Sequence, residues 1–142
     1  MIKKFFYLLV LFSFVSFSAP ALAGSSYIKD YKTGQRLYQY DGSYVKSYSS
    51  GQRLYEIDGK YIKDYKTGQR LYQYDGKYIK DYKTGRRLLA FDGAYVKDYS
   101  SGARLLEFSG KYVKKYSSGE RLMESDGIIP QVVVALIVLG KL

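Results

Sequence analysis

The segment from Tyr27 to Gly42, YIKDYKTGQRLYQYDG, recurs residue for residue between positions 61 and 76, and four looser copies complete a tandem array of six. The repeat length is 17 residues, and no residue separates one copy from the next. A unit this short holds two strands and two tight turns. The array therefore predicts a repeat fold in which each copy is one supersecondary unit.

Two fixed glycines mark the turns of each copy. The Asp41-Gly42 pair lies between runs rich in Tyr, Ile, Val and Leu, a strong signal for a hairpin with a type I′ turn. The segment Lys32-Thr33-Gly34, which reads Ser-Ser-Gly in other copies, fits a three-residue loop with glycine in the left-handed conformation. Each repeat is then one hairpin, and six repeats make twelve antiparallel strands of about five or six residues.

These two turns also predict the register. If residues 32–34 form the loop, Asp30 faces Arg36, and an ion pair between strands is expected in each copy that keeps both residues. If Asp41-Gly42 is the next turn, the two strands that flank a given strand pair with it at equivalent positions of the repeat. We therefore expect no stagger around the ring and strands that lie nearly along its axis, in contrast to strongly sheared barrels.

Alternation along the strands sorts the side chains into two faces. In the first copy one face collects Ile28, Tyr38 and Tyr40. The other face carries a lysine that occurs in all six copies, as Lys29, Lys46, Lys63, Lys80, Lys97 and Lys114. Six lysines inside a closed barrel would be prohibitively costly to desolvate. We therefore place the lysines outside, as a ring at one height, and assign them as candidate anion-binding residues.

The C-terminal segment 128–142, IIPQVVVALIVLGKL, is apolar on all sides, as a buried helix should be. Pro130 suits a first helical turn and Gly140 suits a helix end. An unsheared ring of twelve strands has a radius of roughly 9 Å, which short side chains alone do not fill. We expect this helix to fill the lumen. The alternatives are a membrane span, for which the segment is short, and a thirteenth strand, which its valines favour.

The first 23 residues have the pattern of a secretory signal peptide: Lys3 and Lys4, an apolar run from Phe5 to Phe17, and Ala21-Leu22-Ala23 as a cleavage site. The alternative is an uncleaved anchor. The expected organisation is a signal peptide at 1–23, a six-repeat domain at 24–127 and the apolar helix at 128–142. The expected location is the periplasm or the exterior of the cell, with association with a membrane as a further expectation.

The chain is basic, with a formal net charge of +10 that falls to +8 without Lys3 and Lys4, because all acidic residues lie beyond position 23. Such a surface favours anionic partners. After export these are anionic phospholipids or envelope glycans; no motif for sequence-specific nucleic acid binding is present. The other reading is that the lysines solubilise exposed strands. The oligomeric state is left open.

Catalysis is not expected, because the chain has no histidine and no cysteine. The Ser26 to Lys29 and Ser43 to Lys46 spacings and the Lys32-Thr33-Gly34 segment echo penicillin-binding enzymes, but their third motif, S-D-N, is missing. The repeated aspartates are better explained by structural ion pairs. We assign no catalytic residue, no cofactor and no metal.

The pattern Y-I-K-D-x-x-[TS]-G-x-R-L-x-x-x-D-G resembles the hairpin repeat of bacterial β-flower proteins over residues 27–127. The resemblance implies an all-β fold of six hairpins that close, with sixfold pseudo-symmetry, into a twelve-stranded antiparallel β-flower or barrel around a hydrophobic C-terminal helix. That architecture is similar to the tubby C-terminal domain and the phospholipid scramblases. This similarity implies binding to anionic membrane lipids, by fold analogy alone. Three functions follow as hypotheses: a non-enzymatic module that binds anionic lipids or envelope polyanions, a structural or assembly scaffold, and a carrier that holds a lipid or small ligand in the lumen.

Overall fold

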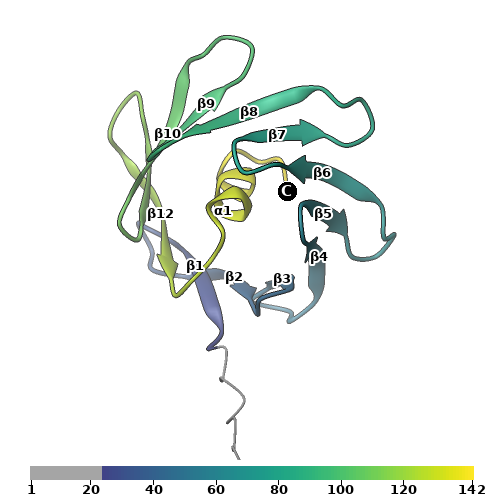
Figure 1. Ribbon diagram of the computed structural model, residues 1–142. Coiled ribbons are helices and arrows are strands. Elements are labelled where there is room, and N and C mark those ends of the chain that lie inside the picture. Colours follow the sequence, from purple (N-terminus) through teal and green to yellow (C-terminus); the bar gives the residue numbers. More distant parts are fainter. Residues whose placement is uncertain (1–23) are drawn as a thin grey trace, which may run out of the picture.

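The computed structural model describes residues 24–142, which form twelve β-strands and one α-helix (Figure 1). The predicted signal peptide, residues 1–23, lies outside the described residues. The strands are β1 (Ser26–Asp30), β2 (Arg36–Tyr40), β3 (Tyr44–Ser47), β4 (Arg53–Asp58), β5 (Tyr61–Asp64), β6 (Arg70–Tyr74), β7 (Tyr78–Asp81), β8 (Arg87–Asp92), β9 (Tyr95–Asp98), β10 (Arg104–Ser109), β11 (Tyr112–Lys115) and β12 (Arg121–Asp126). The helix α1 runs from Gln131 to Val138.

The strands close into an antiparallel barrel, which confirms the predicted fold class. Each strand pairs with the next one along the chain, and β1 pairs with β12 to close the ring. At this seam the chain passes close to itself: a side chain at Gly127, where φ is +102°, would overlap the Oγ atom of the buried Ser26. Glycine is therefore required there both by conformation and by space.

The short turns are shifted by one residue from the prediction. Tyr40 pairs with Val45, so the two central residues of this turn are Gly42 and Ser43 rather than Asp41 and Gly42. Gly42 has a φ of +99°, and no non-glycine residue within 24–142 has a positive φ. The predicted type I′ turn is therefore wrong, since that turn needs positive φ at both central positions; glycine in the first position is typical of type II′.

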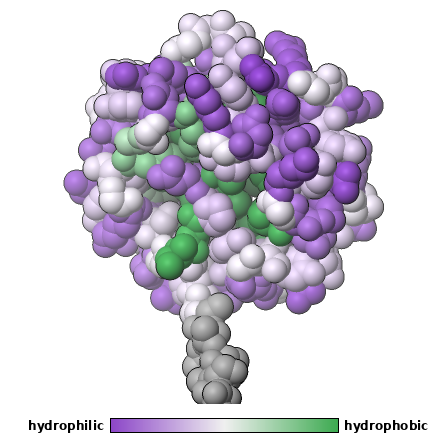
Figure 2. Space-filling view, viewed as in Figure 1, coloured by the Kyte–Doolittle hydropathy of each residue, from purple (hydrophilic) through white to green (hydrophobic). Residues whose placement is uncertain are grey.

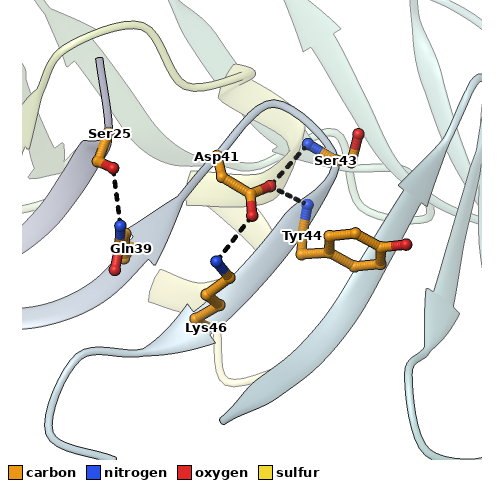
Figure 3. Close-up of polar contacts among 6 residues, drawn as sticks. All are labelled: Ser25, Gln39, Asp41, Ser43, Tyr44 and Lys46. Carbon is orange, nitrogen blue, oxygen red and sulfur yellow. Dashed lines mark hydrogen bonds and ion pairs between the residues drawn. The ribbon is translucent and has the colours of Figure 1, made fainter. Parts of the chain in front are cut away.

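Asp41 explains the shift, because its side chain caps the turn. Its Oδ1 atom accepts hydrogen bonds from the backbone N–H of Ser43 at 3.1 Å and of Tyr44 at 2.8 Å (Figure 3). Aspartate commonly stabilises turns in this way, by binding backbone groups two or three residues later. The aspartate of the Asp-Gly pair therefore precedes the turn instead of forming half of it.

The other loop holds four residues, from Tyr31 to Gly34, rather than the predicted three. The backbone N–H of Gly34 donates to the Asp30 carbonyl at 2.9 Å, and Gly34 has the expected left-handed conformation with φ of +69°. The Asp30 carboxylate accepts the backbone N–H of Thr33 at 2.8 Å and its hydroxyl at 2.9 Å. The predicted ion pair between Asp30 and Arg36 is therefore wrong: the carboxylate caps its own loop.

A β-bulge in every hairpin completes this correction. Ile28 pairs with Tyr38, but Lys29 pairs with Arg36, so Leu37 is an extra residue on β2. Equivalent register shifts occur in the other five hairpins. Simple alternation would point Arg36 into the barrel; the bulge places it opposite the outward-facing Lys29 instead.

The strands are also staggered, contrary to the prediction. Gln39 pairs with Tyr27 on one side and with Lys46 on the other, and Lys46 lies two residues beyond Tyr44, the equivalent of Tyr27. The register therefore advances by two residues per repeat. Six such steps around twelve strands correspond to a strand tilt of about 35° and a radius of roughly 11 Å. The predicted axial strands are wrong because the short turns lie one residue later than the Asp-Gly pair indicates and each hairpin contains a bulge.

The core confirms the assignment of faces. The first inward position of each repeat is fully buried, as Ile28, Val45, Ile62, Ile79, Val96 and Val113. Helix α1 occupies the middle of the ring (Figure 1), and Val133, Val134, Ala135 and Leu136 are buried against this wall. The hydroxyl of Tyr72 donates to the Lys141 carbonyl at 2.8 Å, which ties the end of the chain to the wall. Among residues 24–142 no helix has both the length and the apolar character needed to cross a membrane.

Candidate anion-binding surface

The six predicted lysines lie on the outer face, but most are already paired with carboxylates. Four of them contact aspartates at or beside the short turns, in the pairs Lys29–Asp126 at 3.0 Å, Lys46–Asp41 at 2.9 Å (Figure 3), Lys63–Asp58 at 2.6 Å and Lys97–Asp92 at 2.7 Å. The hydrogen bond from Lys63 lowers the pKa of Asp58, and that from Lys97 lowers the pKa of Asp92. In the described part of the chain, Lys80 and Lys114 have no carboxylate within 4.0 Å. The six lysines share the outer face, but most of their charge is balanced within the protein.

The arginine of every repeat is stacked between two tyrosines on the outer face. The Arg36 guanidinium carbon lies 4.1 Å from the ring centre of Tyr27 and 5.7 Å from that of Tyr48, while the two rings meet edge to face at 5.7 Å. The same cluster recurs around the arginines Arg53, Arg70, Arg87, Arg104 and Arg121. Sequence reasoning missed these clusters because they depend on the bulge that turns the arginine outward.

Charge is distributed unevenly around the ring. Residues 60–94, which form β5 to β8 and their turns, contain nine Lys or Arg and four Asp or Glu, a net charge of +5. Residues 24–59 and 95–127 each carry a net charge of only +1. We refer to residues 60–94 as the basic sector. One third of the barrel wall therefore carries most of the excess charge, although the repeats suggest sixfold symmetry.

The basic sector also holds most of the uncompensated cations. Within residues 24–142, the cations of this sector that have no carboxylate within 4.0 Å and no tyrosine sandwich are Lys60, Lys66, Lys77, Lys80, Lys83 and Arg86. Elsewhere two further lysines outside the predicted ring are paired, Lys32 with Glu120 and Lys111 with Glu124, both at 3.0 Å. The signal for the sector was the local excess of lysine and arginine in residues 60–94, which an average over the repeats conceals.

The acidic side chains of this surface are dispersed among the hairpins. Within residues 24–142, His, Cys, Asp and Glu side chains form no group of three that could hold a metal ion. The loop aspartates, which could have formed a carboxylate cluster, each cap a separate hairpin, as Asp30 does. No family model matches the chain, and no curated protein or solved structure is significantly similar to it.

One exposed apolar side chain lies at an end of the barrel that also carries free cations. Ile128 is 91% exposed and follows the turn glycine Gly127, just as Lys60 and Lys77 follow the turn glycines of their own repeats. The three residues therefore occupy equivalent positions at one end of the ring. Figure 2 shows hydrophobic side chains gathered near the middle of one face of the molecule, within a largely hydrophilic surround.

Proposed function

We propose that the protein is an exported, non-catalytic module that binds anionic membrane lipids through the basic sector. The observation that carries the proposal is the net charge of +5 on residues 60–94, where most of the lysines lack an internal carboxylate partner. Charges that are already paired contribute little to the attraction of a ligand, whereas free lysines near an anionic membrane each strengthen binding.

A membrane is favoured over a soluble polyanion by Ile128. This side chain is 91% exposed at the same end of the barrel as Lys60 and Lys77. Ile128 follows β12 at the seam with β1, so it lies across the ring from Lys77. An apolar side chain at the same end of the barrel as free cations suits the interface of a bilayer, which offers acyl chains beneath phosphate groups. A polysaccharide would offer no comparable apolar layer.

The architectural similarity to the tubby domain and the scramblases supports the same proposal by fold analogy alone, whereas the resemblance to the β-flower proteins implies only the fold. The carrier hypothesis gains no support, because helix α1 occupies the lumen. Nothing in the arrangement of the described residues specifically favours the scaffold hypothesis.

Sedimentation with lipid vesicles tests the proposal. The protein should sediment with vesicles that contain phosphatidylglycerol and not with pure phosphatidylcholine vesicles, and binding should weaken as salt rises. Ile128→Ser should reduce vesicle binding without changing retention on a soluble polyanion such as heparin. Binding to heparin without binding to phosphatidylglycerol vesicles would replace the lipid by an envelope glycan as the partner.

A further inference from the structure

One outward-facing position of the repeat carries a small side chain in only one of the six copies. The position lies between the first tyrosine and the lysine of neighbouring strands, and it is occupied by Gln39, Glu56, Gln73, Ala90, Glu107 and Glu124. In the fourth copy, Ala90 on β8 pairs with Tyr78 on β7 and with Lys97 on β9. A long polar side chain fills this place in the other five copies, whereas the alanine leaves a hollow on the outer face.

The hollow is a cavity of about 290 Å³ within and beside the basic sector. Its lining includes Lys77, Tyr78, Ala90, Asp92, Lys97 and Tyr99. This volume suits a small polar group rather than a drug-sized ligand. The cavity therefore fits the head group of a lipid or a free molecule of similar size.

The cavity lining holds two lysines and two carboxylates; Asp92 is paired with Lys97 and Asp98 caps its own loop, so Lys77 is the charged lining group that stays free for an anion. Lys77 has no carboxylate within 4.0 Å in the described chain, and its Nζ atom lies 5.3 Å from the ring centre of Tyr78. Lys97 is paired with Asp92 at 2.7 Å, so the charges of these two lining groups balance each other. The hydroxyl of Tyr99 already accepts a hydrogen bond from Arg87 at 3.4 Å, so its own proton is free to be donated to a ligand.

We propose that this cavity, which we call the Ala90 pocket, binds a phosphate ester, with Lys77 as its principal counter-ion. The inference rests on the proposed function and deepens it, because it gives the basic sector one defined site in addition to diffuse attraction. The ester is the head group of an anionic phospholipid or a soluble phosphate ester of the same size. Both sources present the same oxygens to Lys77 and Tyr99.

Glycerol 3-phosphate, titrated by calorimetry or NMR at constant ionic strength, tests the pocket directly. We expect saturable binding with one site per chain. Ala90→Gln, which installs the residue found at positions 39 and 73, should weaken this binding at least about tenfold while the circular dichroism spectrum stays unchanged.

Two further variants separate the pocket from general charge. Lys77→Gln should weaken binding about as strongly as Ala90→Gln, whereas Lys60→Gln should leave it within about twofold. Lys60 is the matched control, because it follows a turn glycine, lies 5.3 Å over the ring of Tyr61 and belongs to the same sector, but its neighbouring position holds Gln73. Gln73→Ala should open an equivalent hollow near Lys60 and raise the number of sites to two.

The outcomes distinguish the pocket from the proposed function. Equal binding of glycerol 3-phosphate to wild type, Ala90→Gln and Lys77→Gln would overturn the pocket, whatever the vesicles show. Saturable binding that Ala90→Gln abolishes, in a protein that ignores phosphatidylglycerol vesicles, would establish the pocket for a soluble ester and overturn the membrane proposal. If Ala90→Gln weakens the binding of both, the lipid head group is the source of the ester.

Discussion

The Nζ atom of Lys63 lies 2.6 Å from the Oδ2 atom of Asp58, whereas Lys80, one repeat later, has no carboxylate within 4.0 Å in the described chain. The two lysines occupy the same position of the repeat and the same sector. They therefore form a matched pair in which one ammonium group is neutralised internally and the other is free for a partner.

This pair should separate stability from binding. Lys63→Gln removes an ion pair and leaves Asp58 without its partner, so we expect a small drop in melting temperature and little loss of vesicle binding. Lys80→Gln should leave the melting temperature unchanged and weaken binding to phosphatidylglycerol vesicles. Thermal unfolding and vesicle sedimentation of both variants check this. If Lys63→Gln weakens vesicle binding and Lys80→Gln does not, the ion pair between Lys63 and Asp58 opens when a membrane is present.

The stacked arginines should contribute more to folding than their unstacked neighbours. The Arg87 guanidinium carbon lies 4.2 Å from the ring centre of Tyr78 and its Nη1 atom donates to the Tyr99 hydroxyl at 3.4 Å, whereas Arg86 is exposed and makes neither contact. Arg87→Gln should lower the melting temperature, and Arg86→Gln, with the same change in charge, should not. Equal melting temperatures would show that the tyrosine clusters form without the guanidinium.

The loop aspartates should make the protein sensitive to acid. Hydrogen bonds from the backbone N–H of Ser101, and then from the hydroxyls of Ser100 and Ser101, lower the pKa of Asp98 from 3.8 to about 2. Because the folded-state pKa lies below the unfolded one, the ionised carboxylate stabilises the fold above about pH 4, and this contribution disappears as the pH falls through about 2.

NMR titration of the Asp98 carboxyl should therefore give a midpoint near 2. Asp98→Asn should be less stable than wild type at neutral pH and should lose less stability between pH 4 and pH 2. A carboxyl that titrates near 3.8 in the folded protein would contradict the capping role.

The helix should act as the filler of the barrel. Leu136 is fully buried at the middle of α1, so Leu136→Ala should lower the free energy of unfolding by about 2 to 5 kcal/mol. Gln131→Ala, at the exposed first residue of the same helix, should change it by less than about 0.5 kcal/mol. Urea denaturation measures both, and equal small effects would place the helix outside the core.

The architecture was predictable because three signals agreed. The period of 17 residues indicated hairpins, the Ile or Val that precedes each lysine indicated the inward face, and the uniformly apolar C-terminal segment indicated a central helix. Small errors in turn geometry do not change them.

The register was not predictable by the same means, because it depends on where the extra residue of each hairpin lies. Leu37 follows the alternation of an ordinary strand, and nothing in its chemistry marks it as a bulge. The Asp-Gly pattern predicts that Asp41 is part of the turn, but its side chain caps the turn from the preceding position. These two local hydrogen-bonding choices produce the stagger of two residues per repeat and turn the arginines outward.

The sequence predicted that the candidate site consists of outward-facing lysines, but not which of the lysines are free. The invariance of the six lysines pointed to a symmetric ring, but invariance also accompanies a structural ion pair, as between Lys63 and Asp58. The asymmetry in charge lies where the copies differ. The excess of cations in residues 60–94 and the single Ala90 are both visible in the sequence.

The most direct measurement compares two triple variants that lose the same charge. The first replaces the free lysines Lys60, Lys66 and Lys83 by glutamine, and the second replaces the paired lysines Lys32, Lys46 and Lys111. In sedimentation with phosphatidylglycerol vesicles at fixed salt, we predict that the first variant binds at least about tenfold more weakly than wild type and that the second stays within about threefold. Equal losses in the two variants, with both proteins folded, would contradict the account, because net charge alone would then explain the binding.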